Sequence, residues 1–111
     1  MKIDHTLKTL PRFFKAVAEG RKPFEIRRTD RHFEVGQTIV LAEVDETTQE
    51  PTGQVLMRRI TYVAIIGRLP PRVTIGRESS LVPQFEVATT GGELAVLGLE
   101  AVPAEDVEVV R

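Results

Sequence analysis

The spacing of apolar residues in the first fifth of the chain predicts a helix. Four apolar side chains recur at helical spacing and make one face: Leu10, Phe13, Phe14 and Val17. Thr9 is expected as the N-cap, and Pro11 suits a first turn, where its missing N–H costs little. Gly20 is expected just beyond the C-terminus, where a left-handed residue commonly ends a helix. These signals together predict a helix over residues 10–19.

Beyond that helix, the patterns are those of strands. Period-two alternation and runs of β-branched residues predict strands at 24–29, 38–44, 55–66, 72–75 and 94–102. Residues 1–8 are compatible with a further first strand, and 46–54 form a polar loop. Residues 76–93 have no clear period and receive no assignment. The tail from Pro103 fits either a short helix or an extra strand.

One early helix followed by short strands predicts a mainly β fold, a small β-barrel with a helical addition. The 111 residues fit a single domain over 1–111. We expect the helix to pack across one opening of the barrel, with Phe13 or Phe14 buried. The expected core consists of Leu10, Phe13, Val17, Phe24, Ile26, Ile39, Leu41, Ile60, Val63, Ile65, Leu94, Val96 and Leu97.

Composition excludes several kinds of site. The chain has no cysteine, so it can form neither a disulfide nor a thiolate metal site, and its only histidines are His5 and His32. We therefore expect no metal and no cofactor. No apolar run approaches the roughly 20 residues of a membrane helix, and the N-terminus is charged where a signal peptide is apolar. A soluble, cytoplasmic protein is expected, with its oligomeric state left open.

Charge is unevenly distributed along the chain. Residues 1–31 hold nine Lys or Arg and four Asp or Glu, whereas residues 32–111 hold six basic and twelve acidic residues. A basic N-terminal third is typical of proteins that meet an anionic ligand such as a nucleic acid. The alternative is that the two parts neutralise each other across the fold.

The segment GRKPFEIRRTDR, residues 20–31, combines high charge with strand-like alternation. Successive side chains of a strand point to opposite faces, so Phe24 and Ile26 share one face and Glu25 and Arg27 the other. We expect the apolar pair to anchor the strand to the core. The charged face has two interpretations. It is either a ladder of solvated ion pairs, each contributing less than about 1 kcal/mol, or a site that grips an anion.

Residues 20–27, GRKPFEIR, resemble the G-x-K-x-x-E-x-R signature of ASCH domains, small β-barrels of the PUA-like superfamily. Residues 5–11 resemble the H-x-L-K-x-x-P opening of a small phage and bacterial branch to which RNA binding is attributed. Residues 29–36, the pair at 52–53 and the RITYV at 59–63 resemble further blocks of that branch, in the same order. Two features depart from it. Gln37 replaces an aspartate, and an aromatic strand motif is absent at 93–97.

The resemblance implies binding of RNA or a nucleotide in a cleft beside the signature. Phosphate contacts from basic groups give affinity without sequence readout. Few aromatic residues are left outside the expected core to stack on bases. Arg12, Lys15 and Arg28 are expected on a solvated face. The candidate binding residues are His5, Lys8, Lys22, Glu25, Arg27, Asp30 and Arg31.

Two other functions stay open. Some ASCH proteins resemble amidohydrolases that remove an acyl group from a modified cytidine, using the signature lysine and a threonine. Lys22 holds the lysine position here, but Glu25 holds that of the threonine, and a carboxylate cannot replace a hydroxyl nucleophile by the same route. Glu25 would then act as a general base or as a salt-bridge partner. The third function is a structural or phage adaptor without catalysis.

Overall fold

The computed structural model describes residues 2–76 and 84–102, and the tail at 103–111 lies outside this part of the chain. One helix and seven strands are present in the described residues. They are β1 (His5–Thr9), α1 (Pro11–Ala18), β2 (Phe24–Arg28), β3 (Thr38–Val44), β4 (Pro51–Ile66), β5 (Arg72–Ile75), β6 (Phe85–Ala88) and β7 (Leu94–Ala101). The expected mainly β composition is therefore confirmed.

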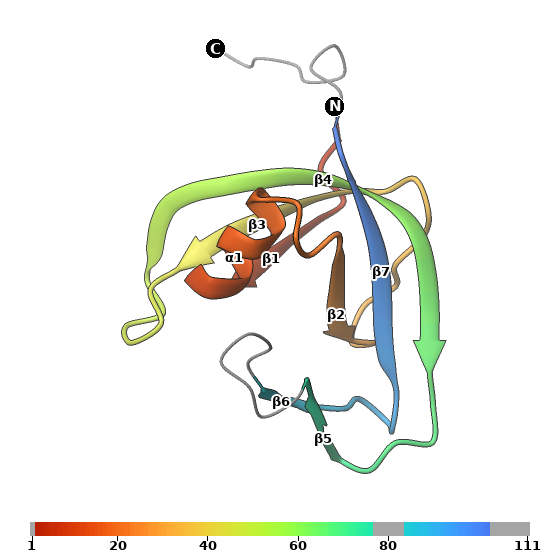
Figure 1. Cartoon of the computed structure of the whole chain (residues 1–111). Coiled ribbons are helices and arrows are strands. Elements are labelled where there is room, and N and C mark those ends of the chain that lie inside the picture. Colours follow the sequence, from red (N-terminus) through yellow and green to blue (C-terminus); the bar gives the residue numbers. More distant parts are fainter. Residues whose placement is uncertain (1, 77–83, 103–111) are drawn as a thin grey trace.

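Five of the strands form one curled sheet, in the order β1-β3-β4-β7-β2. The β1–β3 pair is parallel, and the other neighbours are antiparallel. Figure 1 shows the long strand β4 arching over α1, with β1 and β3 on one side of the curve and β7 and β2 on the other. Strands β5 and β6 form a separate hairpin. The sheet is thus a half-barrel whose two edges are β1 and β2.

Strand β7 lies between β4 and β2 and contains a glycine where both neighbours come close. Gly98 pairs with Tyr62 of β4 and with Phe24 of β2. A Cβ atom at this position would lie 2.9 Å from Thr61 Oγ1 and 3.2 Å from Tyr62 Cβ. The β4–β7 register also shifts between Ile60 and Tyr62, as in a β-bulge. A residue without a side chain is therefore required where the sheet bends.

Helix α1 matches the predicted segment, but its first cap differs. The N-cap is Leu10 without a side-chain hydrogen bond, because Thr9 instead ends β1 and is buried. Gly20 has φ 78° and follows the helix end as expected. Phe14 and Val17 are the buried residues of α1. No helix in the described part of the chain is long and apolar enough to cross a membrane.

The strand boundaries agree with the pattern except at two places. β4 begins at Pro51, inside the segment predicted as a loop, and the remaining turn is organised by Asp45. The backbone N–H groups of Thr47 and Thr48 donate to its carboxylate and lower the pKa of Asp45. β6 lies in the segment that lacked a periodic pattern. Its four residues are FEVA.

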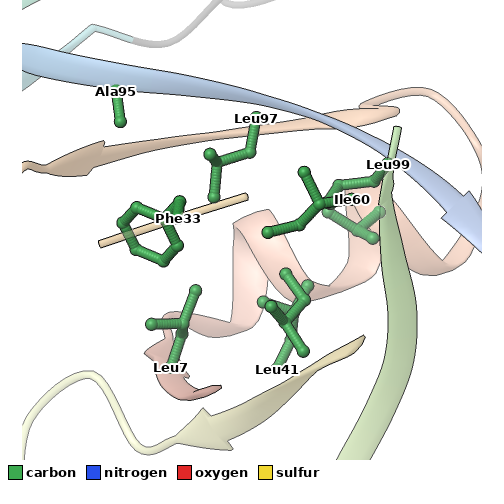
Figure 2. Close-up of a cluster of buried hydrophobic side chains, with 9 residues drawn as sticks. Leu7, Phe33, Leu41, Ile60, Ala95, Leu97 and Leu99 are labelled. Carbon is green, nitrogen blue, oxygen red and sulfur yellow. The ribbon is translucent and has the colours of Figure 1, made fainter. Parts of the chain in front are cut away.

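The core lies inside the curve of the sheet (Figure 2). Six predicted core residues are buried: Val17, Ile39, Leu41, Ile60, Leu94 and Leu97. Leu10, Phe13, Ile26, Val63 and Val96 are half-buried. The cluster of buried apolar side chains that forms this core also contains four residues that were not predicted to belong to it: Leu7, Phe33, Ala95 and Leu99.

Two predicted core residues are exposed. Ile65 is 55% exposed and Phe24 is 37% exposed. Ile65 lies near the end of β4, where it pairs with Ala95 of β7. Phe24 lies on the face of β2 opposite the buried Glu25. Alternation identified the faces of β2 correctly, but the assignment of the apolar face to the interior was wrong.

Truncation of two isoleucines in β4 tests this core. Ile60→Ala should lower the free energy of unfolding by about 2–5 kcal/mol, because it leaves a cavity in the cluster. Ile65→Ala is the matched control and should change it by less than about 0.5 kcal/mol, because Ile65 is largely in solvent. Urea denaturation measures both values. Equal losses would contradict the described packing.

Candidate functional site

A buried carboxylate lies at the centre of the charged stretch. Glu25 is 2% exposed. Its Oε1 accepts a hydrogen bond from Lys22 Nζ at 3.0 Å, and its Oε2 accepts one from Arg27 Nε at 2.9 Å. The two cations are themselves 15% and 25% exposed. The structure therefore brings Lys22, Glu25 and Arg27 together as one ion-paired group, which we call the charged triad.

Local structure explains how the triad forms. Glu25 and Arg27 are two residues apart in β2, so their side chains leave the same face of the strand. Lys22 lies in the turn between α1 and β2, where its backbone N–H donates to Ala16 O at 3.1 Å. Gly20 allows the left-handed backbone that this turn requires. A fixed turn thus places a third side chain over the charged face of β2.

Arginine side chains connect the two edges of the half-barrel. Arg27 Nη2 donates to Lys8 O at 2.9 Å and to Thr9 Oγ1 at 3.3 Å. Arg31 Nη1 lies 3.5 Å from Thr6 O. These bonds run from β2, and the turn after it, to the outer edge of β1. We call this junction the seam. Guanidinium groups there satisfy strand carbonyls that a neighbouring strand would otherwise bond.

Two adjoining hollows open along the seam. The first, the charged cavity, has a volume of about 180 Å³ and is lined by the triad together with Lys8, Thr9, Phe13 and Phe85. The second, the basic groove, has a volume of about 300 Å³ and is lined by Thr6, Lys8, Arg27, Arg28, Asp30 and Arg31. Lys8 and Arg27 line both hollows, so the two lie side by side. Four cations and one carboxylate give the groove a positive potential that attracts anions.

Six of the seven candidate binding residues meet at the seam, and His5 does not. His5 Nε2 lies 2.9 Å from Gln37 Oε1, and its ring packs against Phe33 with centroids 4.8 Å apart. The amide oxygen of Gln37 also accepts the N–H of Glu34 at 2.8 Å. His5 and Gln37 thus hold the β1 end of the sheet to the turn before β3. Neither lines the charged cavity or the basic groove.

The structure also adds residues that the patterns placed elsewhere. Arg28 is solvent-exposed as expected, with 56% of its side chain accessible, and it also lines the basic groove. Phe13 was expected in the core and lines the charged cavity with Phe85. The sequence pattern did not predict a role for Phe85, because this residue lies in the segment that received no assignment. In contrast, Arg12 and Lys15 are solvent-exposed, as predicted.

No group of three His, Asp or Glu side chains able to hold a metal ion is found in the described ranges. The polar groups at the seam are cations, the carboxylates of Glu25 and Asp30, and backbone carbonyls. Lys8, Arg28 and Arg31 can bind anionic oxygens, and Arg27 is oriented by its bonds to Glu25 and β1. Such an arrangement suits recognition of a phosphate or a carboxylate.

Removing the central carboxylate tests the triad. Glu25→Gln should lower the free energy of unfolding by about 3 kcal/mol, because two largely buried cations lose their counter-charge. Glu19→Gln is the matched control. Glu19 pairs with Arg21 at 2.7 Å in solvent, and its loss should cost less than about 1 kcal/mol. Chemical denaturation at neutral pH measures the free energy of unfolding of both variants. If both lose less than about 1 kcal/mol, the triad contributes no more than a solvated ion pair.

Comparison with known proteins adds one finding. A family described as a domain of unknown function (DUF3850) matches residues 4–68, which run from β1 to the end of β4 and include the whole charged triad. A search of curated proteins found no match. Because the matched region spans more than half of the 111 residues, the chain belongs to the DUF3850 family.

Proposed function

We propose that this protein binds the phosphate groups of RNA or of a nucleotide at the seam of its half-barrel. The observation that carries the proposal is that Arg27 of the buried charged triad also lines the basic groove. Arg28 and Arg31 are 56% and 43% exposed in their side chains, so a ligand can reach them from solvent. Arg27 is held in one orientation at the base of the groove.

The triad itself supports a binding role. Burying a carboxylate with two cations carries a desolvation cost, and a well-packed apolar group of the same size often serves stability equally well. A fold that needed only a strand anchor would not require charge here. Fixed cations beside an open groove are, in contrast, what phosphate recognition uses. Lys22 and Glu25 then act as the support that orients Arg27.

We further propose that the half-barrel is a PUA-like fold of the ASCH type. The spacing K-x-x-E-x-R supports this, because Lys22, Glu25 and Arg27 are the residues that converge into the triad. The signature therefore has a physical meaning in this chain. Its lysine and arginine neutralise one buried glutamate from two directions, and the arginine extends to β1.

Binding is a better interpretation of the triad than hydrolysis. Each carboxylate oxygen of Glu25 already accepts a hydrogen bond from a cation at 3.0 Å or less. A general base needs an oxygen that can take a proton from water or substrate. The arrangement is suited to holding Lys22 and Arg27 in place, which a binding site requires. Arg28 and Arg31 both pair with Asp30, at 3.7 and 3.9 Å, and about half of each side chain stays open to an anionic ligand.

The proposed contacts predict weak, salt-dependent binding. A short labelled RNA should bind at low salt, and its affinity should fall steeply as salt is raised, because phosphate contacts release counterions. Arg28→Gln should weaken binding and reduce the slope of log K against log salt by about one. Fluorescence anisotropy at several salt concentrations measures both effects.

Arg72→Gln provides the charge-matched control. Arg72 belongs to β5 and pairs with Glu86 at the surface, away from both hollows of the seam. This variant should bind like the unmodified protein. An affinity that ignores salt, or equal losses in the two arginine variants, would contradict phosphate binding in the basic groove. Absence of any RNA or nucleotide binding at low salt would favour the adaptor.

A further inference from the structure

A third hollow adjoins the seam on the side of α1. This aromatic cavity has a volume of about 350 Å³, and three cations, Arg12, Arg21 and Lys22, contribute to its lining. Most of the other lining side chains are large and apolar: Phe13, Phe24, Phe85, Ile26 and Ile75. The volume lies within the range of about 300–1,000 Å³ that is typical of small-ligand pockets. Three of the five phenylalanines of the chain thus surround one cavity instead of filling the core.

The rings are arranged around the ammonium group of Lys22. Lys22 Nζ lies 5.1 Å from the centroid of Phe13 and 5.5 Å from that of Phe24. Phe13 in turn meets Phe85 edge to face, with centroids 4.9 Å apart. The same ammonium donates to Glu25. Lys22 therefore marks the boundary between the aromatic cavity and the charged cavity.

The three hollows adjoin one another in a row. The aromatic and charged cavities share Phe13, Lys22, Ile26 and Phe85 as lining residues. The charged cavity and the basic groove share Lys8 and Arg27. A ligand lying along the row would meet first the aromatic rings, with Arg12 and Arg21 beside them, then the hydrogen-bonding groups of the triad, and finally the exposed cations of the basic groove. That order is the order of base, sugar and phosphate in a nucleotide.

We propose that the aromatic cavity binds the planar base of one nucleotide unit whose phosphate lies in the basic groove. This inference rests on the function proposed above and assigns a separate part of the ligand to each hollow. Phe24 is the principal contact, because this large apolar residue at the start of β2 is 37% exposed. Base–aromatic stacking tolerates any base, since every base has a flat π-face.

Lys22 adds a polar contact to the stacking surface. An ammonium group carries several donor protons, and Glu25 accepts one of them. A base that reaches Lys22 through a carbonyl oxygen or a ring nitrogen accepts another. Bases with an acceptor at this edge are therefore favoured over a purely hydrocarbon ring. The same chemistry is offered by a free nucleotide and by the end of a single strand.

The test compares a short labelled RNA with an abasic oligomer of the same length and charge. The unmodified protein should prefer the RNA by roughly fivefold or more, which corresponds to stacking of one base. Phe24→Leu keeps an apolar side chain but removes the flat ring, and it should abolish most of that preference without changing affinity for the abasic oligomer. Tyr62→Leu is the control, because Tyr62 is a 67% exposed aromatic on β4. Thermal melting of each variant verifies that it is folded.

The outcomes separate this inference from the function on which it rests. Equal binding of both oligomers, or a preference that survives in Phe24→Leu, overturns the base site and leaves phosphate binding intact. Failure of both oligomers to bind at low salt overturns the proposed function and the base site together. Competition by a nucleoside monophosphate, but not by ribose 5-phosphate, supports the base site and shows that a free nucleotide suffices. Displacement only by longer RNA supports the strand end as the ligand.

Discussion

The burial of one carboxylate between two cations is the constraint on which the arrangement of the site depends. An isolated charge removed from water is very unfavourable, so Glu25 can lie inside the curl only with Lys22 and Arg27 beside it. This requirement sets the face of β2 that turns inward. It also fixes the turn after α1 that supplies Lys22. Phe24 is consequently directed to the opposite face, where it lines the aromatic cavity.

The same interaction closes the half-barrel. Strands β1 and β2 are the edges of the five-stranded sheet, and Arg27 spans them by bonding Glu25 on one side and the β1 backbone on the other. A hydrogen-bonded ladder between two strands leaves no room for a ligand, whereas a seam held by side chains leaves hollows between them. In this fold the structural role of the triad and the proposed binding role are therefore consequences of one geometry.

The sequence predicts the elements of this fold better than it predicts their environment. The helix, the alternation in β2 and the whole of β3 follow from local spacing, since period and β-branching are properties of neighbouring residues. The burial of Glu25 follows only if the charged face of β2 is a site and not a solvated ladder, and spacing alone does not choose between them, because the choice depends on Lys22 from the turn and on β1 across the seam. The same limit applies to His5, which the family resemblance grouped with the site although Gln37 holds it elsewhere. It applies equally to Phe85, whose place beside Phe13 depends on a distant hairpin.

The central claim is that Glu25 holds Arg27 in one desolvated orientation across the seam. NMR measurement of solvent exchange at the arginine Nε–H groups tests it most directly. We expect the Nε–H of Arg27 to exchange much more slowly than that of Arg72, whose side chain is 72% exposed, and we expect this protection to disappear in Glu25→Gln. Equally rapid exchange at Arg27 and Arg72 in the unmodified protein would contradict the account.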